Sequence, residues 1–289
     1  MSAEQTFYVN GEWLPPARAS VPVLDRGFLF GDGVYEVIPV YQGRPFRFEQ
    51  HLHRLQDSLD ATGIANPHDP AGWARLLDEA VQRNGGGDRS IYLQVTRGVA
   101  PRRKHPFPMD ITPTVVIMSP PLELPAADVR DSGVAAITRP DPRWRHCNIK
   151  STALLANVML SQEACAAEAV EAILIRDGEL TEGAASNVFV VHDGVVATPP
   201  HGHCLLPGVT RDLIVELAPQ AGITLEERSV AEKELATADE IWISSSTREL
   251  LAVTRRDGET VGNGRVGDVW RTMYDAFQAR KQEWLRGAA

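Results

Sequence analysis

The sequence lacks an apolar run long enough to cross a bilayer, although apolar residues make up 43% of its 289 residues. Its first residues contain no basic segment followed by an apolar one, the pattern that marks a secretion signal. The charged fraction of 23% is typical of a soluble globular protein. We therefore expect a cytoplasmic protein with no membrane partner.

Cysteine is scarce, and the three cysteines form no CxxC pair. An odd number without paired spacing indicates neither a disulfide framework nor a zinc ribbon, so we expect Cys147, Cys165 and Cys204 to be reduced. His201 and His203 adjoin Cys204 in a loop rich in proline and glycine. That loop offers no fourth ligand at a usual spacing, so we predict no metal site.

Concentrated positive charge and nucleotide-binding motifs are also absent. The net charge is -9 and the arginines are scattered, which argues against a general nucleic-acid binder. Without a GxGxxG or GxxxxGK[ST] motif, neither a dinucleotide nor a nucleoside triphosphate is the expected ligand. A serine hydrolase is disfavoured because the chain has no GxSxG elbow.

The length allows two domains of ordinary size. Residues 119–132 are rich in proline and lack a periodic apolar face, so they are the best candidate for a connection between domains. We place the boundary near Pro125, which predicts an N-terminal domain over 1–124 and a C-terminal domain over 125–289. Strands and helices mix without regular alternation, which favours an α+β fold.

Local patterns place the first elements of the chain. Apolar residues at helical spacing predict helices over 48–59 and 73–81. The glycines of 27–33 predict a tight irregular loop that feeds a strand, on which Tyr35 and Glu36 face opposite sides.

Two segments have the makings of an anion site. Gly208, Val209 and Thr210 stand at a predicted helix start, where free N–H groups and the helix dipole attract phosphate. The Ser-Ser-Ser-Thr run at 244–247 follows a predicted strand and offers hydroxyl and backbone donors. Either segment alone is equally compatible with a simple cap or turn, and Arg54 would add a full charge.

Lys150 precedes a helix predicted over 152–167, and it is either a solvated charge or a desolvated nucleophile. Glu182 lies between two predicted strands among small residues and is either a polar turn residue or a ligand-binding carboxylate. A Schiff-base lysine, a phosphate site and a carboxylate that keeps a pyridine nitrogen protonated are the parts that pyridoxal 5'-phosphate requires.

Four motifs occur together, at 30–37 (FGDGVYEV), 148–151 (NIKS), 180–189 (LTEGAASNVF) and 205–212 (LLPGVTRD). With them the chain resembles the fold-type IV pyridoxal-phosphate enzymes, the class IV aminotransferases, from about residue 7 to residue 280. The resemblance implies two domains with the cofactor at their interface, and a homodimer.

The resemblance also implies roles for single residues. Lys150 matches the Schiff-base lysine and Glu182 the partner of the pyridine nitrogen. The residues that match the phosphate site, or stand beside it, are Arg54, Val209, Thr210, Ser245 and Ser246. The sequence departs from the family at Ala184 and Ala185, where serines are frequent, so any hydrogen bonds from those hydroxyls are missing.

Within the family, the segments 92–108 and 143–151 resemble the D-amino-acid transaminases, in which an Arg-x-His pair grips the substrate carboxylate. Arg103 and His105 have that spacing, whereas Arg102 follows the proline as the family's arginine does, so both arginines stay candidates. A guanidinium suits this task because it donates two parallel hydrogen bonds. Tyr35 matches the family's active-site tyrosine.

The expected reaction is ping-pong transfer of the amino group of D-alanine or D-glutamate to a 2-oxo acid such as 2-oxoglutarate or pyruvate. Two rivals come from the same family, a branched-chain aminotransferase acting on L-amino acids and an aminodeoxychorismate lyase. The loop that carries Arg102, Arg103 and His105 argues against both rivals. A more remote alternative is a non-catalytic binding protein that kept the fold, for which Lys150 would carry no cofactor.

Overall fold

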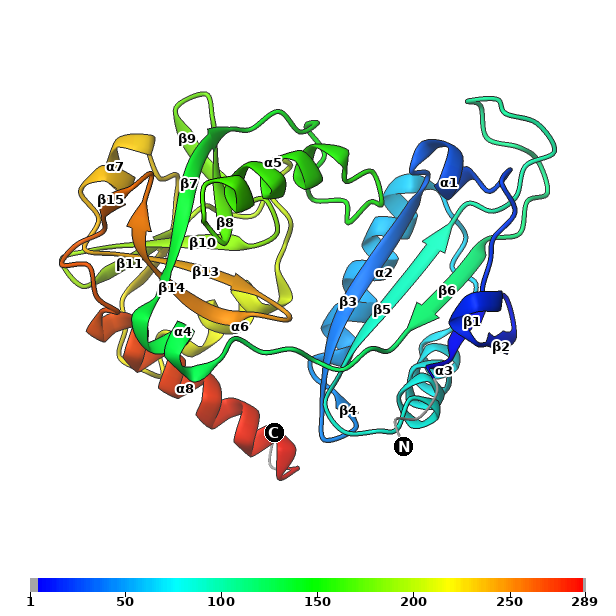
Figure 1. Cartoon of the computed structure of the whole chain (residues 1–289), viewed down its shortest axis with the longest axis horizontal. Coiled ribbons are helices and arrows are strands. Elements are labelled where there is room, and N and C mark those ends of the chain that lie inside the picture. The colour runs from blue at the N-terminus through cyan, green and yellow to red at the C-terminus, as the bar shows by residue number, and fades with distance from the viewer. Residues whose placement is uncertain (1–4, 288–289) are drawn as a thin grey trace. The chain divides into compact units, whose positions relative to one another are not determined.

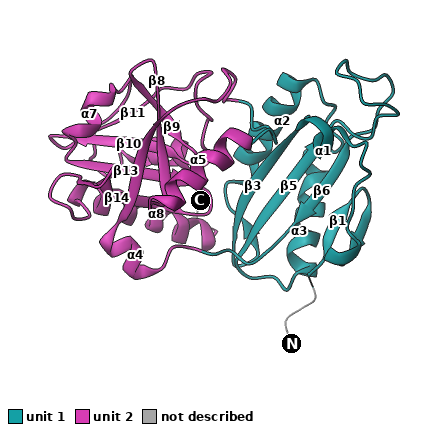
Figure 2. Ribbon diagram, turned by 45° about the horizontal axis from the view of Figure 1, so that its top comes forward, with its two compact units in different colours: residues 1–123, 149–154 teal, residues 124–148, 155–289 magenta. Residues whose placement is uncertain are grey.

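The computed structural model describes residues 5–287 and divides into two compact units (Figures 1 and 2). Unit 1 comprises residues 1–123 and 149–154, and unit 2 comprises 124–148 and 155–289. The outermost residues of both predicted domains lie outside the described range. The segment 149–154, which carries Lys150, groups with unit 1, whereas the sequence assigned it to the C-terminal domain.

Unit 1 is built on a six-stranded antiparallel sheet with the order β2-β1-β6-β5-β3-β4. Its strands are β1 (Phe7–Val9), β2 (Glu12–Leu14), β3 (Gly33–Tyr41), β4 (Arg44–Pro45), β5 (Arg89–Thr96) and β6 (Thr114–Met118). The helices are the short 3-10 turn η1 (Pro16–Arg18), α1 (Arg26–Phe30), α2 (Phe48–Thr62) and α3 (Pro70–Arg83).

The core of unit 1 lies between its sheet and the two long helices (Figure 1). Alternate residues of β3, Val34 and Ile38 among them, point into this core, where they meet Leu55 and Leu59 of α2 and Trp73 of α3. Two helices predicted from periodicity are confirmed, because each places one apolar stripe on the sheet.

Unit 2 holds a mixed nine-stranded sheet with the order β12-β11-β10-β13-β14-β7-β8-β9, and β15 pairs with β14. Its strands are β7 (Val134–Pro140), β8 (Glu171–Arg176), β9 (Glu179–Gly183), β10 (Asn187–His192), β11 (Val195–Thr198), β12 (Leu225–Glu227), β13 (Glu240–Ser245), β14 (Glu249–Arg256) and β15 (Glu259–Thr260). Its helices are α4 (Ala127–Ser132), α5 (Leu155–Ala166), α6 (Val209–Leu217), α7 (Glu232–Ala236) and α8 (Asp268–Leu285).

Two expectations are wrong in detail. The glycine-rich loop at 27–33 begins as the short helix α1, because Asp25 accepts a hydrogen bond from the Gly27 N–H and Gly31 ends the helix in the left-handed region. The proline-rich connection contains the short helix α4, which has no buried residue and hence no apolar period to reveal it. The mixed α and β content agrees with the predicted fold class. No helix within residues 5–287 combines the length and apolar character that crossing a membrane requires.

Candidate active site

The Lys150 segment runs beside β3 and is fixed there by main-chain bonds. The Tyr35 N–H donates to the Lys150 carbonyl at 2.9 Å, and the Lys150 N–H donates to the Ser58 hydroxyl of α2 at 3.2 Å. Thr152 continues the attachment, since its N–H donates to the Gly33 carbonyl at 2.9 Å. The backbone of Lys150 is therefore held by a strand and a helix rather than by a surface turn.

The Lys150 ammonium lies over an aromatic ring. Its Nζ is 4.3 Å from the centroid of the Tyr35 ring, which attracts a cation through its π face. Tyr35 stacks in turn on Tyr92, with the ring centroids 5.7 Å apart. Lys150 is only partly exposed. Two sequence candidates, Tyr35 and Lys150, are thus brought together within unit 1.

Arg54 is buried in a second cluster of unit 1. It donates from Nε to one Glu36 oxygen and from Nη2 to the other, each at 2.8 Å, while His51 Nδ1 lies 2.8 Å from the same carboxylate. Burial raises the pKa of Glu36, but the Arg54 charge and the hydrogen bonds of Arg54 and His51 outweigh it and lower the pKa to about 2. The guanidinium of Arg54 is thereby locked in one orientation.

Acid should destabilise the protein through Glu36. Its pKa in the folded chain, about 2, lies below the unfolded value of 4.5, so its contribution is complete above pH 4.5 and disappears as the pH falls toward 2. The shift corresponds to roughly 3 kcal/mol by linkage. Burial lowers the pKa of His51, so this side chain stays neutral while it is buried. Protonation of His51 at low pH should therefore also destabilise the folded protein.

Urea unfolding measured between pH 7 and pH 3 should therefore show a weaker pH dependence for Glu36→Gln than for the wild type. The matched control is Glu79→Gln, because Glu79 forms only an exposed pair with Arg83. Equal slopes for the wild type and Glu36→Gln would show that Glu36 is not held ionised.

The candidate carboxylate loop joins β5 to β6, and Arg102, Arg103 and His105 are all exposed on it. Arg103 and His105 both contact Phe30 of α1. The centroid of the Phe30 ring is 4.9 Å from the Arg103 guanidinium and 5.3 Å from the centroid of the His105 ring. Within residues 5–287, Arg102 makes no hydrogen bond or ion pair. The structure thus brings Arg103 and His105 together on Phe30 and leaves Arg102 apart.

Two buried arginines and the partly exposed Asp32 hold that loop in place. Asp32 accepts hydrogen bonds from Arg26 at 2.6 Å and from Arg97 at 2.8 and 2.9 Å. Arg26 also donates to the carbonyl groups of Lys104 at 2.6 Å and His105 at 2.9 Å. Burial raises the pKa of Asp32, but its bonds to the two arginines lower the pKa below its ordinary value. The loop backbone is thus tied to the strand that carries Tyr35.

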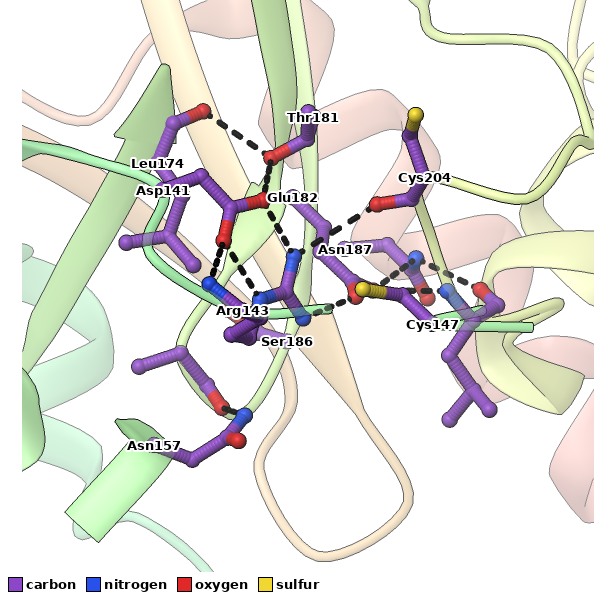
Figure 3. Close-up of polar contacts among 12 residues, drawn as sticks. Asp141, Arg143, Cys147, Asn157, Leu174, Thr181, Glu182, Ser186, Asn187 and Cys204 are labelled. Atoms are coloured by element: carbon purple, nitrogen blue, oxygen red, sulfur yellow. Dashed lines mark hydrogen bonds and ion pairs between the residues drawn. The ribbon is translucent and has the colours of Figure 1, made fainter. Parts of the chain in front are cut away.

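In unit 2, Glu182 lies buried on β9 with a set of donors around it (Figure 3). Arg143 donates to its Oε1, while the Leu206 N–H and the Asn187 side-chain amide donate to its Oε2 at 3.0 and 3.3 Å. Charge and hydrogen bonds of this kind favour the ionised carboxylate. The interpretation of Glu182 as an ordinary polar turn residue does not fit a buried side chain with these partners.

The candidate anion site of unit 2 is formed by the start of α6 and the end of β13. Gly208 caps α6 without a side-chain acceptor, so the N–H groups of Val209 and Thr210 receive no side-chain cap. A Cβ on Gly208 would overlap the Asn187 side-chain oxygen, which explains the glycine. The Asn187 amide therefore contacts both Glu182 and this helix start.

The serine run follows the same sheet. Ser244 pairs with Asn187 across β10 and β13, and its buried hydroxyl has no hydrogen-bond partner among residues 5–287. Ser245 and Ser246 follow it and are partly exposed. An uncapped helix start and an unpaired buried hydroxyl are what a bound phosphate would satisfy, so the residues present fit a phosphorylated cofactor.

Sequence reasoning missed three members of the Glu182 cluster, namely Asp141, Arg143 and Asn187. The first two lie in the segment before Lys150, and Arg143 donates to both carboxylates. Asn187 lies five residues after Glu182 within the motif at 180–189, and that place in the motif is the sequence signal for it. His201, considered for a metal site, lies against Asp212 and Arg211, and no group of three possible metal ligands occurs within residues 5–287.

The chain is similar to known aminotransferases. The family model for class IV aminotransferases matches residues 33–255. A D-alanine aminotransferase of Bacillus licheniformis is 42% identical over 93% of this chain and 94% of its own length. The solved branched-chain amino acid aminotransferase of Escherichia coli has a TM-score of 0.89 at 27% identity, over 96% of this chain and 94% of that chain.

A hypothetical aminotransferase of Mycobacterium tuberculosis, solved in a pyridoxal-phosphate-bound form, has a TM-score of 0.82 at 25% identity, over 95% of this chain and 98% of that one. The family model and the Bacillus relative each extend over most of the sequence. The chain therefore belongs to the class IV aminotransferase family.

Proposed function

We propose that this protein is a pyridoxal-phosphate-dependent transaminase that moves the amino group of D-amino acids, D-alanine and D-glutamate foremost, to a 2-oxo acid such as 2-oxoglutarate or pyruvate. The observation that carries the proposal is the 42% identity, over nearly the whole chain, to a protein named D-alanine aminotransferase. The pairing of Arg103 and His105 on Phe30 supports it independently.

Side chains described above would hold the cofactor. Glu182 would pair with the ring nitrogen, and Lys150 would hold the reactive carbon. The residues proposed to bind the phosphate are Arg54, Val209, Thr210, Ser245 and Ser246. When bound, pyridoxal phosphate supplies an electron sink for the electron pair that remains when the substrate's α-carbon loses its proton.

Lys150 moves the proton. As the proposed base, the Lys150 amine would take the proton from the substrate's α-carbon, and the position of its Nζ over the Tyr35 ring limits the directions in which it can reach. Arg103 and His105 hold the substrate carboxylate, and a guanidinium with two parallel donors fixes which face of the α-carbon meets the base. Handedness thus follows from where the carboxylate is held relative to Lys150.

A paired-enantiomer assay tests the proposal. Purified protein is given D-alanine, L-alanine or L-leucine, each with 2-oxoglutarate, and the D- and L-glutamate formed are measured by chiral chromatography. We expect turnover of D-alanine alone. Consumption of L-alanine or L-leucine alone would instead establish the branched-chain function, which the fold similarity to the Escherichia coli enzyme makes the second candidate.

Exposed apolar side chains support the homodimer that the family resemblance implies. In unit 1, Phe28 on α1 is 70% exposed and Met109 on the β5–β6 loop is 88% exposed. In unit 2, Leu155, Val158 and Met159 form an exposed stripe at helical spacing on α5. Apolar side chains gathered in this way mark interaction surfaces.

Light scattering after gel filtration should accordingly give about twice the chain mass of 31.7 kDa. Phe28→Asp combined with Met109→Asp should shift the protein toward the monomer, because each buries a charge in an apolar contact. A wild-type monomer at micromolar concentration would contradict the homodimer.

A further inference from the structure

Arg143 bridges two buried carboxylates in unit 2 (Figure 3). Its Nε and Nη2 donate to the two oxygens of Asp141, each at 2.9 Å, and its Nη1 donates to Glu182. The exposed fractions of the three side chains are 7% for Arg143, 0% for Asp141 and 6% for Glu182. A cation placed between two anions away from water interacts strongly with both.

Asp141 fixes the direction in which Arg143 points. Besides the two guanidinium bonds, it accepts from the Arg143 N–H at 3.0 Å and from the Thr181 hydroxyl at 3.0 Å, and Arg176 lies 3.0 Å away. Burial raises the pKa of Asp141, but its bonds to Arg143 and the Arg176 charge lower it, so Asp141 stays ionised. The arginine is therefore oriented by a charge that does not titrate near neutral pH.

Two further donors to Glu182 are electrically neutral. Asn187 and the Leu206 N–H bond to it without a charge. Burial raises the pKa of the nearby Cys147 thiol, which keeps that sulfur protonated. Among these contacts, Arg143 is the one that lowers the proton affinity of the carboxylate by charge.

We propose that Arg143 is a positioning residue that keeps the proton shared by Glu182 and the cofactor's ring nitrogen on the nitrogen. This inference rests on the proposed function, in which Glu182 pairs with that nitrogen. A carboxylate and a pyridine nitrogen have similar proton affinities, so the charge state of the pair depends on its surroundings. Without the guanidinium, Glu182 becomes more basic, takes the proton, and leaves a neutral ring that attracts electrons less strongly.

The test is nitrogen-15 NMR of the holoenzyme, loaded with cofactor labelled at the ring nitrogen, at neutral pH. The wild type should show a protonated nitrogen, and Arg143→Gln should move its signal toward that of neutral pyridine. The rate of the first half-reaction with D-alanine should fall roughly 10- to 100-fold, in line with the loss of a charge-assisted hydrogen bond.

The matched control is Arg145→Gln, two residues along the same segment, because Arg145 is exposed and lies 3.5 Å from the equally exposed Asp177. It should leave both signal and rate at wild-type values. Arg143→Lys retains the charge, so its signal should stay protonated even where the Gln variant fails to fold. A neutral signal in the Lys variant, or a protonated one in Arg143→Gln, would overturn the inference.

Glu182→Gln, measured in parallel, separates the two proposals. A protonated nitrogen signal and an unchanged rate in that variant would show that Glu182 does not pair with the ring nitrogen. That result would reject the proposed role of Glu182 in cofactor binding. A neutral signal in Glu182→Gln together with a protonated signal in Arg143→Gln would leave the proposed function intact and reject only the role of Arg143.

Discussion

Replacement of Lys150 by alanine should abolish both covalent attachment of the cofactor and transamination. The lysine is the only proposed base for the α-carbon, and a positioned acid or base contributes about 10²- to 10⁴-fold to a rate. We therefore expect turnover of D-alanine to fall by at least about 10³-fold. Borohydride reduction followed by mass spectrometry should find the cofactor on Lys150 in the wild type and on no lysine in the variant.

Lys233→Ala is the control for that experiment. The chain has four lysines, and Lys233 is exposed on α7, whereas Lys281 is buried and bonded to Glu249 at 2.6 Å. The Lys233 variant should retain both attachment and activity. Attachment that persists in Lys150→Ala would mean that the protein binds its cofactor elsewhere, and unchanged activity would favour a different base.

Added methylamine offers a further check. If Lys150 acts through its amine, a small amine that enters the space left by Lys150→Ala should restore part of the half-reaction rate. The restored rate should rise with the concentration of the unprotonated amine. A folded variant that binds the cofactor yet shows no rescue would suggest that the lysine is needed to release the cofactor to the substrate.

Much of the fold could be predicted because the governing signals are local. The apolar stripes of α2 and α3 follow from spacing within one turn of helix, and the two Asp-Gly turns at 177–178 and 193–194 specify the hairpins beside them. In both turns the aspartate and the glycine adopt positive φ, as that type of hairpin requires. Such signals need no knowledge of the partner strand.

The family also could be identified from sequence, since four short motifs stand in order. The contacts that the motif residues make in the folded chain could not be predicted. The motif at 30–37 contains Asp32, which accepts hydrogen bonds from Arg26 and from Arg97, a residue 65 positions along the chain. Nothing in the local pattern of either segment indicates that pairing.

The Glu182 cluster was hidden for the same reason. Arg143 and Glu182 are 39 residues apart, and the contact depends on how β9 pairs with β8 and on the path that follows β7. An arginine beside tryptophan and histidine looks like any exposed loop residue until the sheet brings a carboxylate to it. Ion pairs between residues far apart in the chain therefore cannot be predicted from a single sequence.

Arg103→Leu should raise the KM for D-alanine by roughly 100-fold, the loss expected for a charge-assisted bond to a carboxylate. Arg103 is preferred to Arg102 because its guanidinium rests on Phe30 beside His105, whose backbone Arg26 holds. A side chain that is already oriented loses less entropy when it binds the substrate. Steady-state kinetics with D-alanine would measure the effect, with kcat changing less than KM.

Arg102→Leu is the paired variant and should change the KM by less than about threefold, because an exposed charge without a fixed partner contributes little. A larger rise in KM for Arg102→Leu than for Arg103→Leu would show that Arg102 binds the substrate carboxylate. The position directly after the proline would then matter more than the contact with Phe30. Equal, small effects of both substitutions would remove the loop from carboxylate binding. In that case the preference for D-amino acids would have to arise from other side chains near Lys150, because the loop would no longer decide which face of the α-carbon meets the base.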